Sequence, residues 1–185
     1  MPEAAPAPTL HWVDELAVDA ALDAELGPLL AAGFPEFADS FHARRYFKQL
    51  PHARLLARQG EALVGHLAVV HRMVGSAAGP RRILGLLDVV VARECRRAGI
   101  GGALLEAAEA RGRAAGVDHL VLFADGDRLY LRHGYRPAPS TLRWLRIHEH
   151  ASLGIAEERV AELRVRTLGE RAWPDGPVDL LGELF

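Results

Sequence analysis

A stretch rich in arginine and glycine, RECRRAGIGG at residues 93–102, has the residue types of an anion-binding loop. It follows the apolar run LLDVVVA and precedes a run of alanines and leucines with helical spacing. The first N–H groups of a helix lack intrahelical partners and lie at the positive end of the helix dipole, glycine lets an anion approach the backbone, and arginine adds charge. The stretch therefore predicts a pyrophosphate cradle built from Arg96, Arg97, Ala98, Gly99, Ile100, Gly101 and Gly102.

Two nucleotide-binding loops fit these residues poorly. A P-loop requires lysine and then serine or threonine after its glycines, and residues 93–102 contain no lysine. A dinucleotide-binding turn places its first glycine directly after the strand and a third one further on, whereas here polar residues come first and Ala103 and Leu104 follow. A connection without a ligand is the remaining alternative, but three glycines and an arginine pair are an unfavourable choice for it.

The composition indicates a compact chain with no general affinity for polyanions. Half of the 185 residues are hydrophobic, and 22 basic against 24 acidic side chains give a formal charge of −2. We expect a proline-rich disordered leader over residues 1–8 and a single domain over residues 9–185. No nucleic-acid or membrane partner is expected, and the single cysteine and the absence of an apolar N-terminal run favour a cytoplasmic location.

The order of apolar patterns predicts an α/β (α+β) fold, a mixed sheet with helices on both faces. The N-terminal part reads as one strand, two helices and three strands: TLHWV, DAALDAELGPLLAAG, FADSFHARRYFKQL, ARLLARQ, ALVGHLAVVHRMV and RILGLLDVVVA. The rest reads as a helix ended by Gly116, a strand, a short helix ended by Gly134 and two late strands: GIGGALLEAAEARGRAAG, VDHLVLFAD, DRLYLRHG, TLRWLRIHEH and RVAELRVRTL.

Two motifs at their observed separation resemble those of the GCN5-related N-acetyltransferases (GNAT). Residues 96–101, RRAGIG, match that family's coenzyme A motif Arg/Gln-x-x-Gly-x-Gly/Ala, and LYLRHGYRP matches its second signature, a tyrosine on a short helix followed by glycine and an aromatic residue. The resemblance covers about residues 53–137. It implies a mostly antiparallel GNAT sheet, acetyl-CoA as cosubstrate, and backbone pairing of Val89, Val90 and Val91 with the pantetheine arm.

The resemblance also implies roles in acetyl transfer. Backbone N–H groups near Val89 to Val91 would stabilise the oxyanion, which needs no particular side chain. Tyr130 stands at the family's tyrosine position and would protonate the departing thiolate; the alternative is an aromatic residue packed on the inner face of its helix. Tyr135, after Gly134, is expected in the core.

The general base is less clearly marked. Many relatives carry a glutamate at one of two strand positions, which here hold Leu87 and Gly85. Asp88 is our candidate, although regular alternation would turn it away from these positions unless a bulge intervenes. Asp125, Asp127 and a water chain are the rivals.

The remaining features leave the acceptor open. His148-Glu149-His150 would place two imidazoles on one side of a strand, but with no further ligand nearby we expect no metal. The tail ERAWPDGPVDLLGELF resembles the ends of aminoglycoside 2'-N-acetyltransferases and nodulation N-acyltransferases; a Trp-Pro turn that fastens the last segment to the sheet explains it equally well. We expect an N-acetyltransferase of a small-molecule primary amine and a possible homodimer through TLRWLRIHEH, with a non-catalytic acyl-CoA-binding or interaction domain as the alternative.

Overall fold

The computed structural model describes residues 7–126, 128–138 and 140–185. These residues form two compact units, which we call unit 1 (residues 7–69 and 88–105) and unit 2 (residues 70–87 and 106–185). The chain passes between the units within two strands, β3 (Ala62–Ser76) and β4 (Arg81–Val91), and within helix α3 (Ile100–Ala114). Each of these elements therefore contributes one part to each unit.

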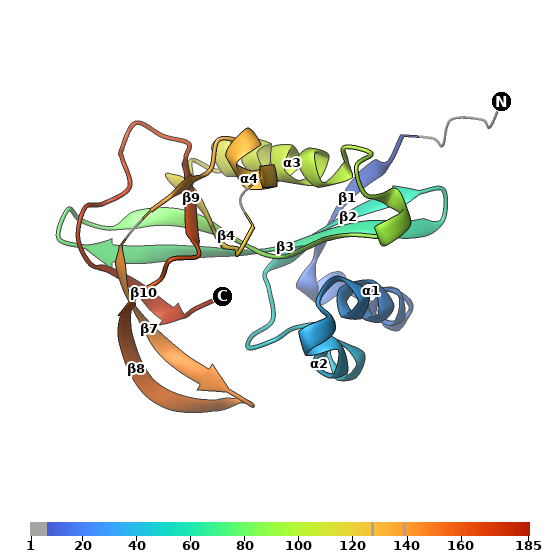
Figure 1. Ribbon diagram of the computed structural model, residues 1–185, viewed down its shortest axis with the longest axis horizontal. Coiled ribbons are helices and arrows are strands. Elements are labelled where there is room, and N and C mark those ends of the chain that lie inside the picture. Colours follow the sequence, from blue (N-terminus) through green and yellow to red (C-terminus); the bar gives the residue numbers. More distant parts are fainter. Residues whose placement is uncertain (1–6, 127, 139) are drawn as a thin grey trace. The chain divides into compact units, whose positions relative to one another are not determined.

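Unit 1 joins an antiparallel sheet to two helices. Its complete elements are β1 (Thr9–Asp14), the 3-10 turn Glu15–Ala17, α1 (Ala20–Gly33), the 3-10 turn Pro35–Phe37, α2 (Ala38–Ala43), β2 (Ala53–Gln59) and the 3-10 turn Arg93–Cys95. β2 pairs antiparallel with both β1 and β3 (Figure 1). The predicted strand ARLLARQ is confirmed with its bounds, because alternating side chains of this run are buried on both faces.

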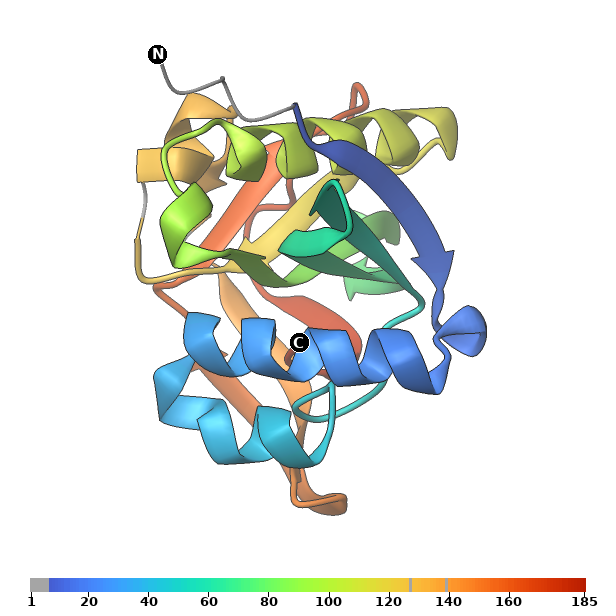
Figure 2. The same cartoon turned by 90° about the vertical axis from the view of Figure 1, so that its right-hand side faces the viewer.

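Helices cover both faces of the unit 1 sheet, as predicted. Leu56 of β2 packs in a cluster with Leu26 and Leu30 of α1, and α2 lies beside α1 in Figure 2. The next residue, Ala57, points to the other face, where a Cβ on Gly65 would stand 3.1 Å from it and 3.0 Å from Ile100 Cγ2 of α3. α1 and the start of α3 therefore lie on opposite faces of this sheet.

Unit 2 carries the late strands. Its complete elements are β5 (His119–Phe123), α4 (Arg128–Arg132), β6 (Arg136–Pro137), β7 (Thr141–His148), β8 (Ala151–Arg159), β9 (Leu163–Thr167) and β10 (Val178–Glu183). The strand order is β6-β9-β5-β4-β3-β10-β7-β8, in which β4–β5 and β7–β10 are parallel and the pairs β5–β9, β6–β9, β3–β10 and β7–β8 are antiparallel. The expected mostly antiparallel, mixed sheet is confirmed.

The two strands β7 and β8 form a long curled hairpin (Figure 1), and its turn corrects one prediction. His148 ends β7, while Glu149 and His150 have φ angles of 43° and 63° and make the turn. The two imidazoles therefore do not lie on one side of a strand. Among the described residues, no group of three His, Cys, Asp or Glu side chains is placed to hold a metal ion.

The second predicted helix, FADSFHARRYFKQL, is also shorter than expected. Only Ala38–Ala43 is helical, and Arg44 is extended with φ −151°. Arg45 donates through Nη1 to the carbonyls of Phe41 and His42, and Arg44 donates to the carbonyls of Tyr46 and Phe47. These guanidinium groups satisfy carbonyls that a longer helix would have paired, so the chain turns away toward β2.

The C-terminal segment is fastened within unit 2. Trp173 Nε1 donates to Ser140 Oγ at 2.9 Å, and its ring meets the His119 ring edge-on at 5.3 Å. The Trp-Pro turn thus fastens the tail, as one of the two interpretations of its sequence expected. The sequence analysis missed β8 and β10. β8 is exposed on both faces and lacks an alternating apolar pattern.

Candidate functional site

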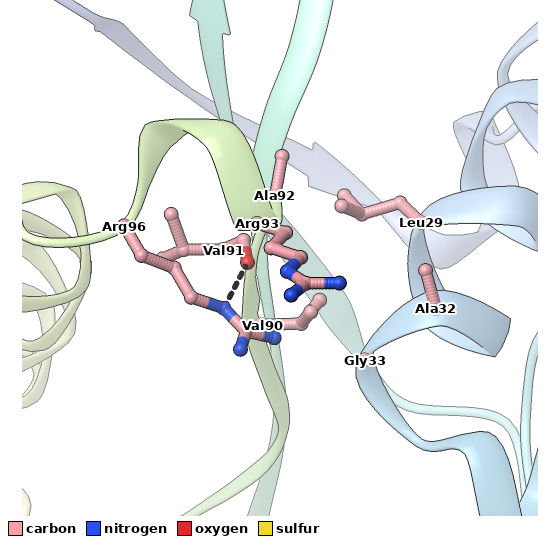
Figure 3. Close-up of a pocket in the computed structure, with 8 residues that line it drawn as sticks. All are labelled: Leu29, Ala32, Gly33, Val90, Val91, Ala92, Arg93 and Arg96. Atoms are coloured by element: carbon pink, nitrogen blue, oxygen red, sulfur yellow. Dashed lines mark hydrogen bonds between the residues drawn. The ribbon is translucent and has the colours of Figure 1, made fainter.

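A cleft of about 420 Å³ in unit 1 lies between the end of α1 and the end of β4 (Figure 3). Of the residues predicted to bind, Val90, Val91 and Arg96 line it. The other lining residues are Leu29, Ala32, Gly33, Ala92 and Arg93. The cleft therefore has an apolar wall from the helix and the strand, and two guanidinium groups where the strand leaves the sheet.

The close approach of α1 to β4 depends on Gly33. A Cβ at this position would stand 2.3 Å from Val90 Cγ2, well inside contact distance. In the sequence, Gly33 is the last residue of the predicted helix DAALDAELGPLLAAG, and that prediction gave no sign of the α1 wall. The signal was present as a small-residue end to an apolar helix, Ala-Ala-Gly, but its partner lies more than fifty residues away.

Arg96 folds back on the strand that precedes it. Its Nε donates to the Val91 carbonyl at 3.3 Å, as Figure 3 shows, and the exposed Arg93 side chain lies beside the same strand end. The positive charge is therefore held at the edge of the cleft.

The loop that leads into α3 has the backbone of a tight turn. Arg97 and Gly99 have φ angles of 71° and 83°, a region that glycine adopts without strain, and a Cβ on Gly99 would meet open space. α3 begins at Ile100, and the Ala103 N–H already bonds to the Gly99 carbonyl at 3.0 Å. Ile100 itself is buried, so its side chain anchors the start of the helix.

β4 is irregular where it enters unit 1. Asp88 has a φ angle of 49°, which interrupts the regular alternation as a bulge would. Its carbonyl accepts a hydrogen bond from His66 Nδ1 at 2.9 Å. Burial raises the pKa of the Asp88 carboxyl to about 6, although the charge of Arg54 opposes the rise.

A family model described as the acetyltransferase (GNAT) family matches residues 18–135, which is more than half of the chain. The chain belongs to the GNAT acetyltransferase family. The match spans α1, the cleft, the loop before α3 and the tyrosine pair of unit 2, so the family expected from the two motifs is confirmed. Members of this family use acetyl-CoA as cosubstrate.

Solved structures share the GNAT fold at low identity. A GNAT family N-acetyltransferase (YhbS) from Escherichia coli, in complex with CoA, superposes with a TM-score of 0.66 at 17% identity over 97% of this chain and 93% of that one. A GNAT acetyltransferase from Brucella melitensis, in complex with acetyl-CoA, gives 0.56 at 21% identity over 92% and 94%. A search of curated proteins by sequence finds no significant match.

The tyrosine position of this GNAT chain lies in unit 2. Tyr130 is half-buried on α4, and its ring meets that of Tyr135 edge-on at 5.9 Å. Burial raises the pKa of Tyr130, so its phenol keeps its proton at neutral pH. Tyr135 is fully buried, which confirms its core position.

The three carboxylates considered as the general base differ in where they lie. Asp125 is exposed in the turn after β5, and Asp127 lies outside the described residues. Asp88 lies in β4, and burial raises the pKa of its carboxyl. No helix among residues 7–126, 128–138 and 140–185 is long and apolar enough to cross a membrane.

Proposed function

We propose that this chain is an acetyl-CoA-dependent N-acetyltransferase, which moves an acetyl group from the thioester to the primary amine of a small acceptor by direct transfer in a ternary complex. The observation that carries the proposal is the unit 1 cleft, which joins an apolar wall to Arg93 and Arg96 of the segment that leads into α3. An acyl donor with an apolar arm and a diphosphate needs both kinds of surface.

The loop before α3 provides the diphosphate site of this proposal. The backbone N–H groups of Gly99, Ile100, Gly101 and Gly102 lie in the first turn of α3 or just before it, where N–H groups lack intrahelical partners. Arg96 and Arg97 add charge, and Arg96 exchanges its bond to the Val91 carbonyl for a phosphate oxygen. Ala98 brings a small side chain between the arginines and the glycines.

The end of β4 provides the place for the pantetheine arm. Val90 and Val91 line the cleft, and the arm pairs with the backbone of Val89, Val90 and Val91 in the proposal. Loss of the Arg96 contact frees the Val91 carbonyl for this pairing. One side-chain movement thus couples diphosphate binding to arm binding.

The chemistry requires one proton to leave the amine and one to reach sulfur. The amine nitrogen forms its bond to the thioester carbon, the carbon–sulfur bond breaks, and the thiolate leaves with the electron pair. Asp88 takes the amine proton, because a carboxyl with a pKa of about 6 is ionised at pH 7 yet basic enough to accept it. Tyr130, whose pKa is raised by burial, gives a proton to the thiolate.

A non-catalytic acyl-CoA-binding domain is the second candidate, and one observation favours it. At Gly85, one of the two positions where many relatives carry a glutamate, a Cβ would stand 2.4 Å from the Phe185 ring and 2.7 Å from Val70. That space is filled by apolar side chains, so this part of β4 has no room for a carboxylate. Such a domain would bind acetyl-CoA without turnover.

Calorimetry with acetyl-CoA, and with NADH and ATP as controls, tests the donor site. The proposal predicts micromolar affinity for acetyl-CoA alone. Release of free thiol in the presence of a panel of primary amines then separates enzyme from binding domain. Binding without thiol release from any amine supports the second candidate, and no binding contradicts both.

The remaining parts of the proposal concern the setting of the reaction. We place the protein in the cytoplasm with a small-molecule amine as acceptor, without a nucleic-acid or membrane partner. β7 is paired on both sides, with β10 and with β8, so the expected dimer pairing through TLRWLRIHEH is wrong. A homodimer itself stays our proposal, with no strand assigned to it. Similarity to the aminoglycoside and nodulation subgroups stays a prediction, for which an aminoglycoside belongs in the amine panel.

A further inference from the structure

His66 is a fully buried histidine of unit 1 with hydrogen-bond partners on both ring nitrogens. Nδ1 lies 2.9 Å from the Asp88 carbonyl oxygen, and Nε2 lies 3.3 Å from Arg54 Nη1. A guanidinium group can only donate, so Nε2 accepts and the ring proton is on Nδ1. Burial, together with the Arg54 charge, lowers the pKa of His66 to about 3 and keeps the ring neutral.

Arg54 is itself held from the other side. It is fully buried, and it donates to Glu15 through Nε at 2.7 Å and through Nη2 at 2.9 Å. Nη2 also donates to the Arg45 carbonyl at 2.9 Å. A continuous chain of hydrogen bonds therefore links the Glu15 carboxylate to the Asp88 carbonyl: Arg54 donates to Glu15 on one side and to His66 on the other, and His66 donates to Asp88.

The chain ends at a backbone position that needs support. Asp88 has a φ angle of 49°, and a non-glycine residue in this region costs about 1–2 kcal/mol unless its surroundings hold it there. A buried ion pair such as Glu15–Arg54 adds little net stability, because desolvation offsets the attraction. The network is therefore better explained by the geometry that it imposes than by the stability that it adds.

The imposed geometry concerns the next amide. The described residues contain no cis peptide bond, and in a trans peptide the carbonyl and the following N–H point in opposite directions. With the Asp88 carbonyl held toward His66, the Val89 N–H is directed away from His66. That amide belongs to the segment at which the proposed function places the oxyanion.

We propose that His66 is a positioning residue: the chain Glu15–Arg54–His66 locks the Asp88–Val89 peptide and so aims the Val89 N–H at the thioester oxygen. This inference rests on the proposed function. His66 touches no substrate and acts only through the peptide that it holds.

Two variants of His66 separate this role from packing. His66→Leu keeps the bulk and removes both hydrogen bonds, whereas His66→Asn places an amide nitrogen near the position of Nδ1 and restores the donor to Asp88. For His66→Leu we expect kcat to fall by about 30-fold, less than the 100- to 1000-fold that follows complete loss of an oxyanion donor. Affinity for acetyl-CoA should change by less than about threefold, and His66→Asn should recover most of kcat.

His119→Leu is the matched control. His119 is a buried histidine of unit 2 whose pKa is also lowered by burial, to about 4, and its Nε2 has no partner among the described residues. This variant should leave kcat within about threefold of wild type, as expected of a residue outside the reacting groups. A loss of kcat equal to that of His66→Leu would overturn the proposal, because it would show a general effect of buried leucine.

The Val89 amide gives a readout that does not need turnover. In a ¹⁵N-labelled protein, acetyl-CoA should shift the Val89 resonance in the wild type and in His66→Asn, but much less in His66→Leu. If the wild type releases no thiol with any amine, the proposed enzymatic function fails. The Val89 shift still tests the role of His66, because it depends on acetyl-CoA binding and not on turnover. The inference would be overturned if acetyl-CoA shifted the Val89 resonance of folded His66→Leu as much as that of the wild type. Equal losses of kcat in His66→Leu and His66→Asn would also overturn it.

Glu15→Gln protects the test if His66→Leu does not fold. The Glu15 side chain is 15% exposed, so the substitution loosens Arg54 without emptying the core. We expect kcat to fall about fivefold with unchanged acetyl-CoA affinity, the loss expected from weakening one charged hydrogen bond. If Glu15→Gln kept the wild-type kcat and the wild-type Val89 shift, the proposed role of the chain Glu15–Arg54–His66 would be wrong.

Discussion

The two halves of β4 use their backbone differently. In unit 2, residues Ile83 to Gly85 pair in regular parallel register with β5, and Phe185 packs over Gly85. In unit 1, the strand is irregular at Asp88, the His66 side chain holds the Asp88 carbonyl, and Val90 and Val91 line a cleft. The half that pairs with β5 is scaffold, whereas the half that lines the cleft is where the backbone can meet a ligand.

The largest effect is expected where the unit 1 half leads into α3. Gly101→Asp places a negative charge in the first turn of α3, and two like charges about 4 Å apart repel by about 4 kcal/mol near a protein surface, so affinity for acetyl-CoA should fall on the order of 1000-fold. Gly101→Ala, the control, adds a Cβ without charge and should cost far less. Calorimetry checks both, and unchanged affinity in folded Gly101→Asp would move the donor site away from this loop.

Tyr130→Phe tests whether a residue of unit 2 takes part in the chemical step. The phenol is the proposed proton donor, and general acids contribute about 100-fold or more, so kcat should fall by about that factor with unchanged acetyl-CoA affinity. Steady-state kinetics with the best amine gives the result. Equal kcat in wild type and variant would remove Tyr130 from the mechanism and leave it as a packed aromatic residue.

Asp88→Asn tests the proposed general base at the irregular position of β4. The folded-state pKa of about 6 means that the carboxylate form dominates above that pH, so kcat/KM should rise with pH through about 6 and then level off. In Asp88→Asn this limb should vanish and kcat/KM at pH 7.5 should fall by about 100-fold. A limb that persists in the variant assigns it to another group, such as Asp125.

A pair of glycine variants sharpens the contrast between the halves. Gly33→Ala forces a methyl group against Val90, and Gly85→Ala forces one against the Phe185 ring. Both should lower the free energy of unfolding by about 1–3 kcal/mol, the usual effect of overpacking. Only Gly33→Ala should also weaken acetyl-CoA binding, and similar binding losses in both variants would contradict the distinction between the halves.

The smallest effect concerns the pH dependence of stability. His66 and His119 have folded pKa values lowered to about 3 and 4, so below about pH 6.5 the unfolded chain binds protons that the folded chain does not, and each histidine removes about 1.4 kcal/mol per pH unit as the pH falls. Asp88, with its raised pKa, opposes this between about pH 6 and 4. Urea unfolding at pH 7, 6 and 5 should show a shallower loss for His66→Asn than for wild type; equal slopes would contradict the buried neutral state.

The sequence was informative where the signal is local. The strand Ala53–Gln59 and the start of α3 near Ile100 follow from neighbouring residues, and both were predicted at or within one residue of their positions. The irregular backbone at Asp88 was named in the sequence only as a possible bulge, because the alternation of side chains along a strand carries no information about φ. Gly33 and the chain from Glu15 to Asp88 were missed, because their partners are separated by 12 to 57 residues and only the fold brings them together.

Amide mapping of β4 with acetyl-CoA shows directly which half of the strand binds the acyl donor. In the ¹⁵N-labelled protein, we expect chemical-shift changes and slower hydrogen exchange at Val89 to Val91 and at Gly99 to Gly102, with little change at Ile83 to Gly85. Changes confined to the Ile83 to Gly85 half, or none in either half at saturating acetyl-CoA, would contradict the assignment of the donor site to the unit 1 half of β4.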